Sequence, residues 1–194
     1  RQRQMCIETA VGISIGSLSG GGDIYLGGTA LTLGNLDQSD LIEGEIRDGG
    51  LFGGSGGSIN KIGTGTLSLV RANTYTGGTT INAGRLRTLD AGALGTGPVT
   101  LNGGVLDPVG DITVSDNFNF AGGAVATRIS TSAEVVRVAN QFVDAGGKDF
   151  LITTTPSATL NTPYTLVTFD TTTYADAAGF QAISITPNVT LKYI

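Results

Sequence analysis

Histidine and tryptophan are absent from this chain of 194 residues, and its one cysteine is Cys6. Without histidine, the chain cannot form a Ser-His-Asp or Cys-His catalytic arrangement, and a His-ligated zinc site is excluded as well. A single cysteine excludes an intramolecular disulfide. No apolar run approaches the roughly 18 residues that a membrane-spanning helix needs. These absences exclude several common enzyme classes and predict no membrane insertion by this segment.

Charged residues are scarce, at 14% of the chain against about 25% in ordinary globular domains. The net charge is -5, and the 11 lysines and arginines are spread thinly along the sequence. A protein that binds nucleic acid through its phosphates needs a basic face. We therefore expect no nucleic-acid partner, and we assign the basic opening letters RQRQ to an N-terminal tail.

Glycine is abundant: the chain combines 31 glycines with 40% hydrophobic residues. This much glycine indicates a chain that turns often, and the lack of a strict Gly-X-Y period excludes collagen. A disordered chain would carry fewer apolar and β-branched residues. The composition therefore predicts an ordered all-β protein.

A repeating pattern gives the strongest structural signal. Residues 79–86 (TTINAGRL) align with residues 99–106 (VTLNGGVL) at an offset of 20. Residues 118–125 (FNFAGGAV) follow at an offset of 19, and residues 142–147 (FVDAGG) follow more loosely after a further 24. Each unit alternates apolar and polar residues, as a strand with one buried face does, and then reaches a small-residue and glycine corner.

A unit of about 20 residues with such short strands predicts one coil of a single-stranded parallel β-helix, or β-solenoid, whose coils bury their apolar faces by stacking. Four residues of the stretch 63–84 are predicted to point inward, namely Leu67, Leu69, Ile81 and Ala83. In the turn region 71–78, Asn73 and the pair Gly77–Gly78 are expected to take unusual backbone angles.

The sequence predicts three parts. Residues 1–12 form an N-terminal tail, natural or left from cloning; residues 13–149 form the coils; and residues 150–194 form Thr-rich final coils or a cap. The best helix candidate is 131–145, but Val135, Val136 and Val138 favour a strand there. Because the chain lacks an initiator methionine and a closing turn, we expect it to be a piece of a longer protein.

Residues 57–86, GSINKIGTGTLSLVRANTYTGGTTINAGRL, resemble the passenger-associated transport repeat, also called the autotransporter-associated β-strand repeat. The stretch departs from the family pattern at Arg71 and Arg85, where small or polar residues are usual. Looser likeness covers most of the chain. The matching positions are Lys61, Gly63, Gly65, Thr66, Leu67, Leu69, Asn73, Tyr75, Gly77, Gly78, Thr79, Ile81, Gly84 and Leu86.

The resemblance implies a passenger of a type V secretion system, exported across the outer membrane of a Gram-negative bacterium and folded as a right-handed parallel β-helix at the cell surface. Its expected partner is the passenger's own C-terminal outer-membrane β-barrel, which this chain does not contain. The implied role is a stalk that aids folding and export, with adhesion or self-association as an added role. The resemblance implies no catalytic residue, cofactor or metal.

An enzymatic alternative is a β-helix hydrolase or lyase that acts on polysaccharides or esters with Asp and Glu side chains. Its candidate residues are Asp107 with Asp111, or Asp144 with Lys148 and Asp149. The residues 53–57, GGSGG, formally match the nucleophile motif G-x-S-x-G, but a nucleophile elbow needs a strand, a turn, a helix and a base.

Two further alternatives concern binding and assembly. The acidic residues Asp37, Asp40, Glu43, Glu45 and Asp48 carry oxygen ligands of the kind that Ca²⁺ prefers, but their spacing matches no known calcium loop, and solvated loop charge is the simpler interpretation. A fibre protein of another system, such as a phage tail, is a third hypothesis for the whole chain.

Overall fold

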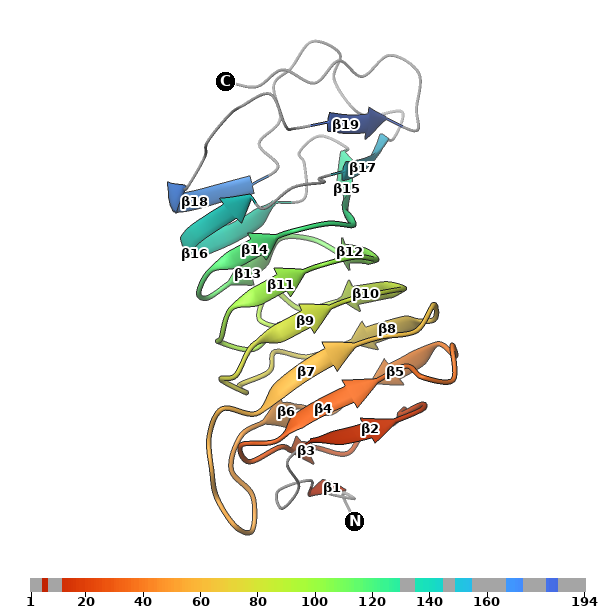
Figure 1. Ribbon diagram of the computed structural model, residues 1–194, viewed down its shortest axis with the longest axis vertical. Coiled ribbons are helices and arrows are strands. Elements are labelled where there is room, and N and C mark those ends of the chain that lie inside the picture. Colours follow the sequence, from red (N-terminus) through yellow and green to blue (C-terminus); the bar gives the residue numbers. More distant parts are fainter. Residues whose placement is uncertain are drawn as a thin grey trace.

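The chain winds into a parallel β-solenoid in the computed structural model (Figure 1). The structure describes residues 5–6, 12–129, 135–144, 149–154, 167–172 and 181–184. Every strand pair within these ranges is parallel, and no helix occurs in them. The predicted all-β parallel β-helix is therefore confirmed.

Three sheets run along the solenoid and are named here by their strand counts. The three-stranded sheet contains β1 (Met5–Cys6), β3 (Ile24–Tyr25) and β6 (Ile46–Arg47). The seven-stranded sheet contains β5 (Asp40–Ile42), β8 (Thr66–Leu69), β10 (Arg85–Thr88), β12 (Val105–Pro108), β15 (Ala124–Ile129), β17 (Asp149–Thr154) and β19 (Gln181–Ser184). The nine-stranded sheet contains β2 (Ile13–Ile15), β4 (Ala30–Leu33), β7 (Ser58–Lys61), β9 (Thr79–Ile81), β11 (Val99–Leu101), β13 (Ile112–Val114), β14 (Phe118–Phe120), β16 (Val136–Asp144) and β18 (Val167–Thr172).

The register of the nine-stranded sheet follows the repeat found in the sequence. Thr79 pairs with Val99, Val99 pairs with Phe118, and Phe118 pairs with Phe142. These pairs reproduce the offsets of 20, 19 and 24. The strand within the former helix candidate is β16, so the preference for a strand over Val136 and Val138 is also confirmed.

Alternating side chains of each strand fill the interior, as a strand with one buried face requires. Leu67, Leu69 and Ile81 are at most 1% exposed. Phe118 and Phe120 of one coil pack against Phe142 of the next coil. The rings of Phe118 and Phe142 are 5.5 Å apart in the edge-to-face arrangement that aromatic pairs prefer. Ala83, which was predicted to point inward, is half-buried.

A column of glycines turns the chain at the corner before the seven-stranded sheet. Gly63, Gly84, Gly104 and Gly123 have φ values of 68°, 66°, 69° and 76°. A Cβ on Gly84 would lie 2.4 Å from the carbonyl oxygen of Gly63 in the coil below. This corner therefore needs glycine for two reasons: the backbone angle and the close approach of neighbouring coils.

The offset between paired strands rises from about 20 to 31 between β16 and β18 and to 32 between β17 and β19. Two further irregularities occur along the solenoid. The first is a loop between β6 and β7, residues 48–57, which projects from the coil at the lower left of Figure 1. It raises the offset between β4 and β7 to 28, since Ala30 pairs with Ser58. The second is β16, whose nine residues pair with both β13 and β14, so that two short strands of one coil are continued by one strand of the next.

Candidate functional surface

Most residues of the transport-repeat pattern lie inside the solenoid. Lys61, Asn73, Tyr75 and Thr79 are at most 4% exposed. Their polar groups are therefore directed at the backbone of their own and neighbouring coils, where a hydrogen-bond partner is needed to offset desolvation. These positions hold the coil together rather than form a reactive centre.

Lys61 ends β7 at the glycine corner and is 1% exposed. Its ammonium Nζ donates hydrogen bonds to the carbonyl oxygens of Ile62 at 2.5 Å, Gly63 at 3.0 Å and Ala83 at 3.4 Å, the last in the coil above. Burial lowers the pKa of Lys61, and the charges of Asp37 and Asp40 partly offset that effect. The side chain thus acts as a buried tie between coils.

Asn73 bridges three coils through its side-chain amide. Oδ1 accepts a hydrogen bond from the backbone N–H of Ile46 at 2.7 Å, and Nδ2 donates to the carbonyl of Ala93 at 2.6 Å. The prediction of an unusual backbone angle at Asn73 is wrong, because Asn73 does not have a positive φ. The asparagine is needed here for the hydrogen bonds of its side chain. Of the pair Gly77–Gly78, Gly78 has a positive φ, at 92°, and Gly77 does not.

Tyr75 is fully buried beside Thr79. Its hydroxyl lies 2.5 Å from Thr79 Oγ1, which in turn donates to the carbonyl of Leu94 at 2.9 Å. Burial raises the pKa of Tyr75 above its usual value, and the hydrogen bond with Thr79 lowers it by a smaller amount. The phenol is consequently neutral and structural.

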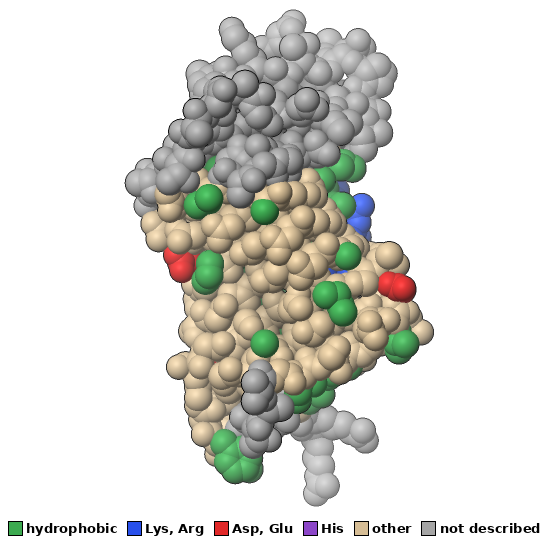
Figure 2. Space-filling model, viewed as in Figure 1, with side chains coloured by type: hydrophobic (Ala, Val, Ile, Leu, Met, Phe, Trp, Pro, Cys, Tyr) green, Lys and Arg blue, Asp and Glu red, His purple; other side chains and the backbone are tan. Residues whose placement is uncertain are grey.

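The outward face of the nine-stranded sheet carries small uncharged polar side chains, and we call it the neutral polar face. It presents one residue per coil in register, namely Ser14, Thr32, Asn60, Thr80, Thr100 and Asn119. Asn102 donates to Asn82 at 2.9 Å, and Asn82 donates to Asn60 at 2.6 Å, which extends the ladder around the corner. Figure 2 shows this side of the molecule as largely tan, with few charged groups.

The outward face of the seven-stranded sheet differs, because arginines gather on it. Arg85 and Arg128 each form an ion pair with Asp107, at 2.9 and 2.7 Å. Arg87 is exposed on the same face and lies in register with Asp107 on the next strand. We call these three arginines and Asp107 the arginine cluster. Blue side chains at the right-hand edge of Figure 2 lie on this side of the solenoid.

The carboxylates proposed for an enzyme are used for other contacts. The side chain of Asp107 is 3% exposed beneath Arg85 and Arg128. Asp111 pairs with Arg137 at 2.7 Å and accepts from the Val135 N–H, and these contacts lower its pKa. Lys148 and the side chains of Asp144 and Asp149 lie outside the described part of the structure.

The acidic residues between 37 and 48 are dispersed over separate hydrogen bonds. Asp37 accepts from the N–H of Thr64 at 2.6 Å, which lowers its pKa. Asp40 accepts from Ser17, Glu45 accepts from Thr74, and Asp48 accepts from the N–H groups of Gly56 and Gly57. Within the described ranges, no three His, Cys, Asp or Glu side chains are grouped to hold a metal ion.

Ser55, the serine of the G-x-S-x-G match, lies in the exposed loop 48–57, with no helix after it.

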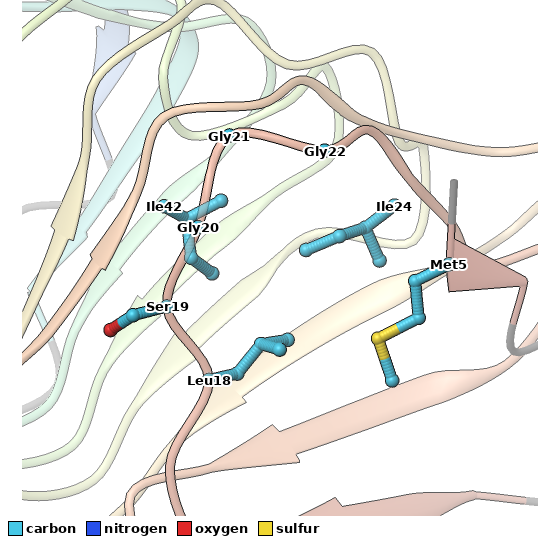
Figure 3. Close-up of a pocket in the computed structure, with 8 residues that line it drawn as sticks. All are labelled: Met5, Leu18, Ser19, Gly20, Gly21, Gly22, Ile24 and Ile42. Carbon is cyan, nitrogen blue, oxygen red and sulfur yellow. The ribbon is translucent and has the colours of Figure 1, made fainter. Parts of the chain in front are cut away.

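A hollow of about 290 Å³ lies near the N-terminal end and is lined by Met5, Leu18, Ser19, Gly20, Gly21, Gly22, Ile24 and Ile42 (Figure 3). This lining supplies one hydroxyl group and no ionisable side chain. In the described residues, no helix is long and apolar enough to cross a membrane.

The chain is a parallel β-solenoid with a structural repeat. Its coils of about 20 residues stack on one another, buried polar side chains form hydrogen bonds between the coils, and one long face is uncharged. Residues 59–87 match the family model of the passenger-associated transport repeat. The matched segment contains β7 to β10, apart from the first residue of β7 and the last of β10. The chain therefore contains an autotransporter passenger repeat, as its sequence predicted.

One curated relative is the protein named "Adhesin BmaC autotransporter" of Brucella suis biovar 1 (strain 1330). It is 34% identical over 87 residues, which are 43% of this chain and 2% of the relative. The compared stretch is thus a small part of a very long protein. No solved structure matches the chain significantly.

Sequence reasoning missed the arginine cluster, although a signal for it existed. Arg87 and Asp107 are 20 residues apart, which is the coil offset, so the repeat places them side by side on neighbouring strands. The charged pairs suggested by the sequence, such as Asp107 and Asp111, are residues near each other along the chain. In a solenoid, the relevant neighbour lies one coil away.

Proposed function

We propose that this chain is a β-solenoid section of an autotransporter passenger, displayed at the bacterial cell surface as a stalk that also aids folding and export. The observation that carries the proposal is the transport repeat at residues 59–87, whose strands are continued in register by coils on both sides. The similarity to a protein named as an autotransporter adhesin supports it. In the whole protein, the expected partner is a C-terminal outer-membrane barrel.

The neutral polar face supports an added role in adhesion or self-association. Hydroxyl and amide groups recur there once per coil, as in the register pair Thr80 and Thr100. Such groups form hydrogen bonds with another surface without the large cost of desolvating charges. For the hydrolase or lyase alternative, by contrast, the two candidate carboxylates that the structure describes, Asp107 and Asp111, are both held by arginines.

Surface display is tested by placing an epitope tag between Leu51 and Phe52, at the exposed tip of the loop 48–57, in the whole protein made by its own host. Antibody should label intact cells as strongly as permeabilised cells. Labelling that requires permeabilisation would contradict the proposal.

The added role has a separate test. The variants Thr80→Asp and Thr100→Asp place charges on the neutral polar face and should reduce clumping of displaying cells or their attachment to surfaces. Ser55→Asp, in the exposed loop 48–57 and outside both the neutral polar face and the arginine cluster, serves as the matched control. Equal behaviour of all three variants and the unmodified protein would remove the added role and leave the stalk role in place.

A further inference from the structure

The arginine cluster brings together charged side chains of three neighbouring strands, with the cations on the two outer strands. Arg85 and Arg87 lie on β10, Asp107 on β12 and Arg128 on β15. Three guanidinium groups and one carboxylate give the four residues of the cluster a net charge of +2, in a chain whose net charge is -5. The local charge is therefore opposite in sign to that of the whole chain and attracts anions.

The cluster is preorganised. Asp107 is buried between Arg85 and Arg128 and holds each at hydrogen-bond distance. Arg128 also donates to the carbonyl of Pro108 at 2.6 Å. Guanidinium groups fixed in this way lose less side-chain entropy when they bind an oxyanion, since their orientation is already set. The side chains of Arg85 and Arg128 nonetheless remain 38% and 39% exposed, so a ligand can reach them.

The residues around the cluster suit a sugar polymer. Thr66 and Ser68 face outward on β8, directly in register with Arg85 and Arg87. Their hydroxyl groups lie on the side of the arginines away from Asp107, where they can pair with ligand hydroxyls. Leu89 follows the end of β10, and Val109 follows the end of β12. Their side chains are 43% and 40% exposed and offer aliphatic contact to the C–H faces of a sugar ring.

Other polyanions fit this face less well. Single-stranded nucleic acid is bound by stacking its bases on aromatic side chains, and the described outward positions of β8, β10, β12 and β15 carry none. Anionic membranes are bound by clusters of about 4–8 lysines and arginines, and this cluster has three. We infer that the arginine cluster is a binding site for the carboxylate or sulfate groups of an acidic polysaccharide.

The inference rests on the proposed function, because such polymers meet the chain only if it is displayed outside the cell. Its test uses the purified 194-residue chain and is thus independent of the epitope-tag experiment. Heparin, polygalacturonate and neutral dextran are immobilised as probes, and binding is measured at low and at near-physiological salt. Binding to heparin or polygalacturonate, weakened by salt, and no binding to dextran are expected.

Two charge-matched variants locate the site. Arg87→Glu, which changes an exposed residue in the cluster, should weaken binding by about tenfold or more, and Arg137→Glu, at an exposed ion pair on β16, by less than about twofold. Circular dichroism verifies that both variants are folded. Failure to bind both acidic probes, or equal weakening by the two variants, overturns the inference. So does tighter Arg87-dependent binding to single-stranded DNA or to anionic phospholipid vesicles.

Discussion

The side-chain amide of Asn73 accepts a hydrogen bond from the backbone N–H of Ile46 at 2.7 Å, across the boundary between two coils. At this position the three-stranded sheet has ended, so no strand ladder satisfies the Ile46 N–H from above. The same amide donates to Ala93 on the other side. The side chain of Asn73 therefore takes the place of the backbone hydrogen bonds that a β-strand would supply at this position, which accounts for its place in the repeat pattern.

Replacing Asn73 should lower the stability of the solenoid. Asn73→Ala leaves the Ile46 N–H and the Ala93 carbonyl buried without their partner, and each lost partner costs about 1–3 kcal/mol. We expect the free energy of unfolding, measured by urea titration, to fall by about 2–6 kcal/mol. Asn82→Ala, an exposed asparagine of the outer ladder, should cost less than about 1 kcal/mol. If the two variants are equally stable, the bridging role of Asn73 is wrong.

The glycine corner predicts a contrast between two Gly→Ala substitutions with similar backbone angles. Gly49 has a φ of 75° with open space around its Cβ position, whereas Gly84 has a φ of 66° and a neighbouring carbonyl 2.4 Å away. Gly49→Ala should cost only the left-handed backbone penalty of about 1–2 kcal/mol. Gly84→Ala should cost about 1–3 kcal/mol more, because the coils must separate. Equal urea midpoints would show that close stacking at this corner is not limiting.

Lys61 makes stability depend on alkaline pH. Its folded pKa lies below the unfolded value of 10.5, so in the interval between the two the unfolded chain binds more protons and stability rises with pH. Lys61→Met lacks this rise. The difference in free energy of unfolding between the original protein and Lys61→Met should therefore shift in favour of the original protein as pH approaches 10.5. A difference that is constant over this range would mean that the ammonium group is not desolvated.

Tyr75 should give the opposite dependence. Its folded pKa is raised above the unfolded value of 10.0, so its contribution is fully present below pH 10.0 and is lost as pH rises beyond that value. Tyr75→Phe should lower stability at neutral pH by about 1–2 kcal/mol through loss of the contact with Thr79. Above pH 10.0 this deficit should shrink. The difference in tyrosinate absorbance between the original protein and Tyr75→Phe, followed with unfolding, checks that Tyr75 ionises only when the chain unfolds, since the chain has five tyrosines.

The repeat offsets predicted the register of the central coils correctly because each coil places its strands by the same alternation of side chains. Val99 and Phe118 pair as the offset of 19 requires. The role of Asn73 was missed because turn-forming tendency and hydrogen bonding between coils favour the same residue type. The arginine cluster was missed because it depends on residues one and two coils apart, whose meeting follows only after the register is known.

The loop 48–57 shows how the solenoid accommodates extra chain. In the coil that carries it, the ladder contacts at Ile46 and Gly57 are eleven residues apart, yet in the next coil Thr74 and Gly77 meet the same two residues with a spacing of three. The eight additional residues leave the neighbouring ladders unchanged, so stacking does not depend on the length of this connection. New segments can therefore be inserted at this corner, by evolution or by design, and exposed on the outside of the solenoid without a change to its core sequence.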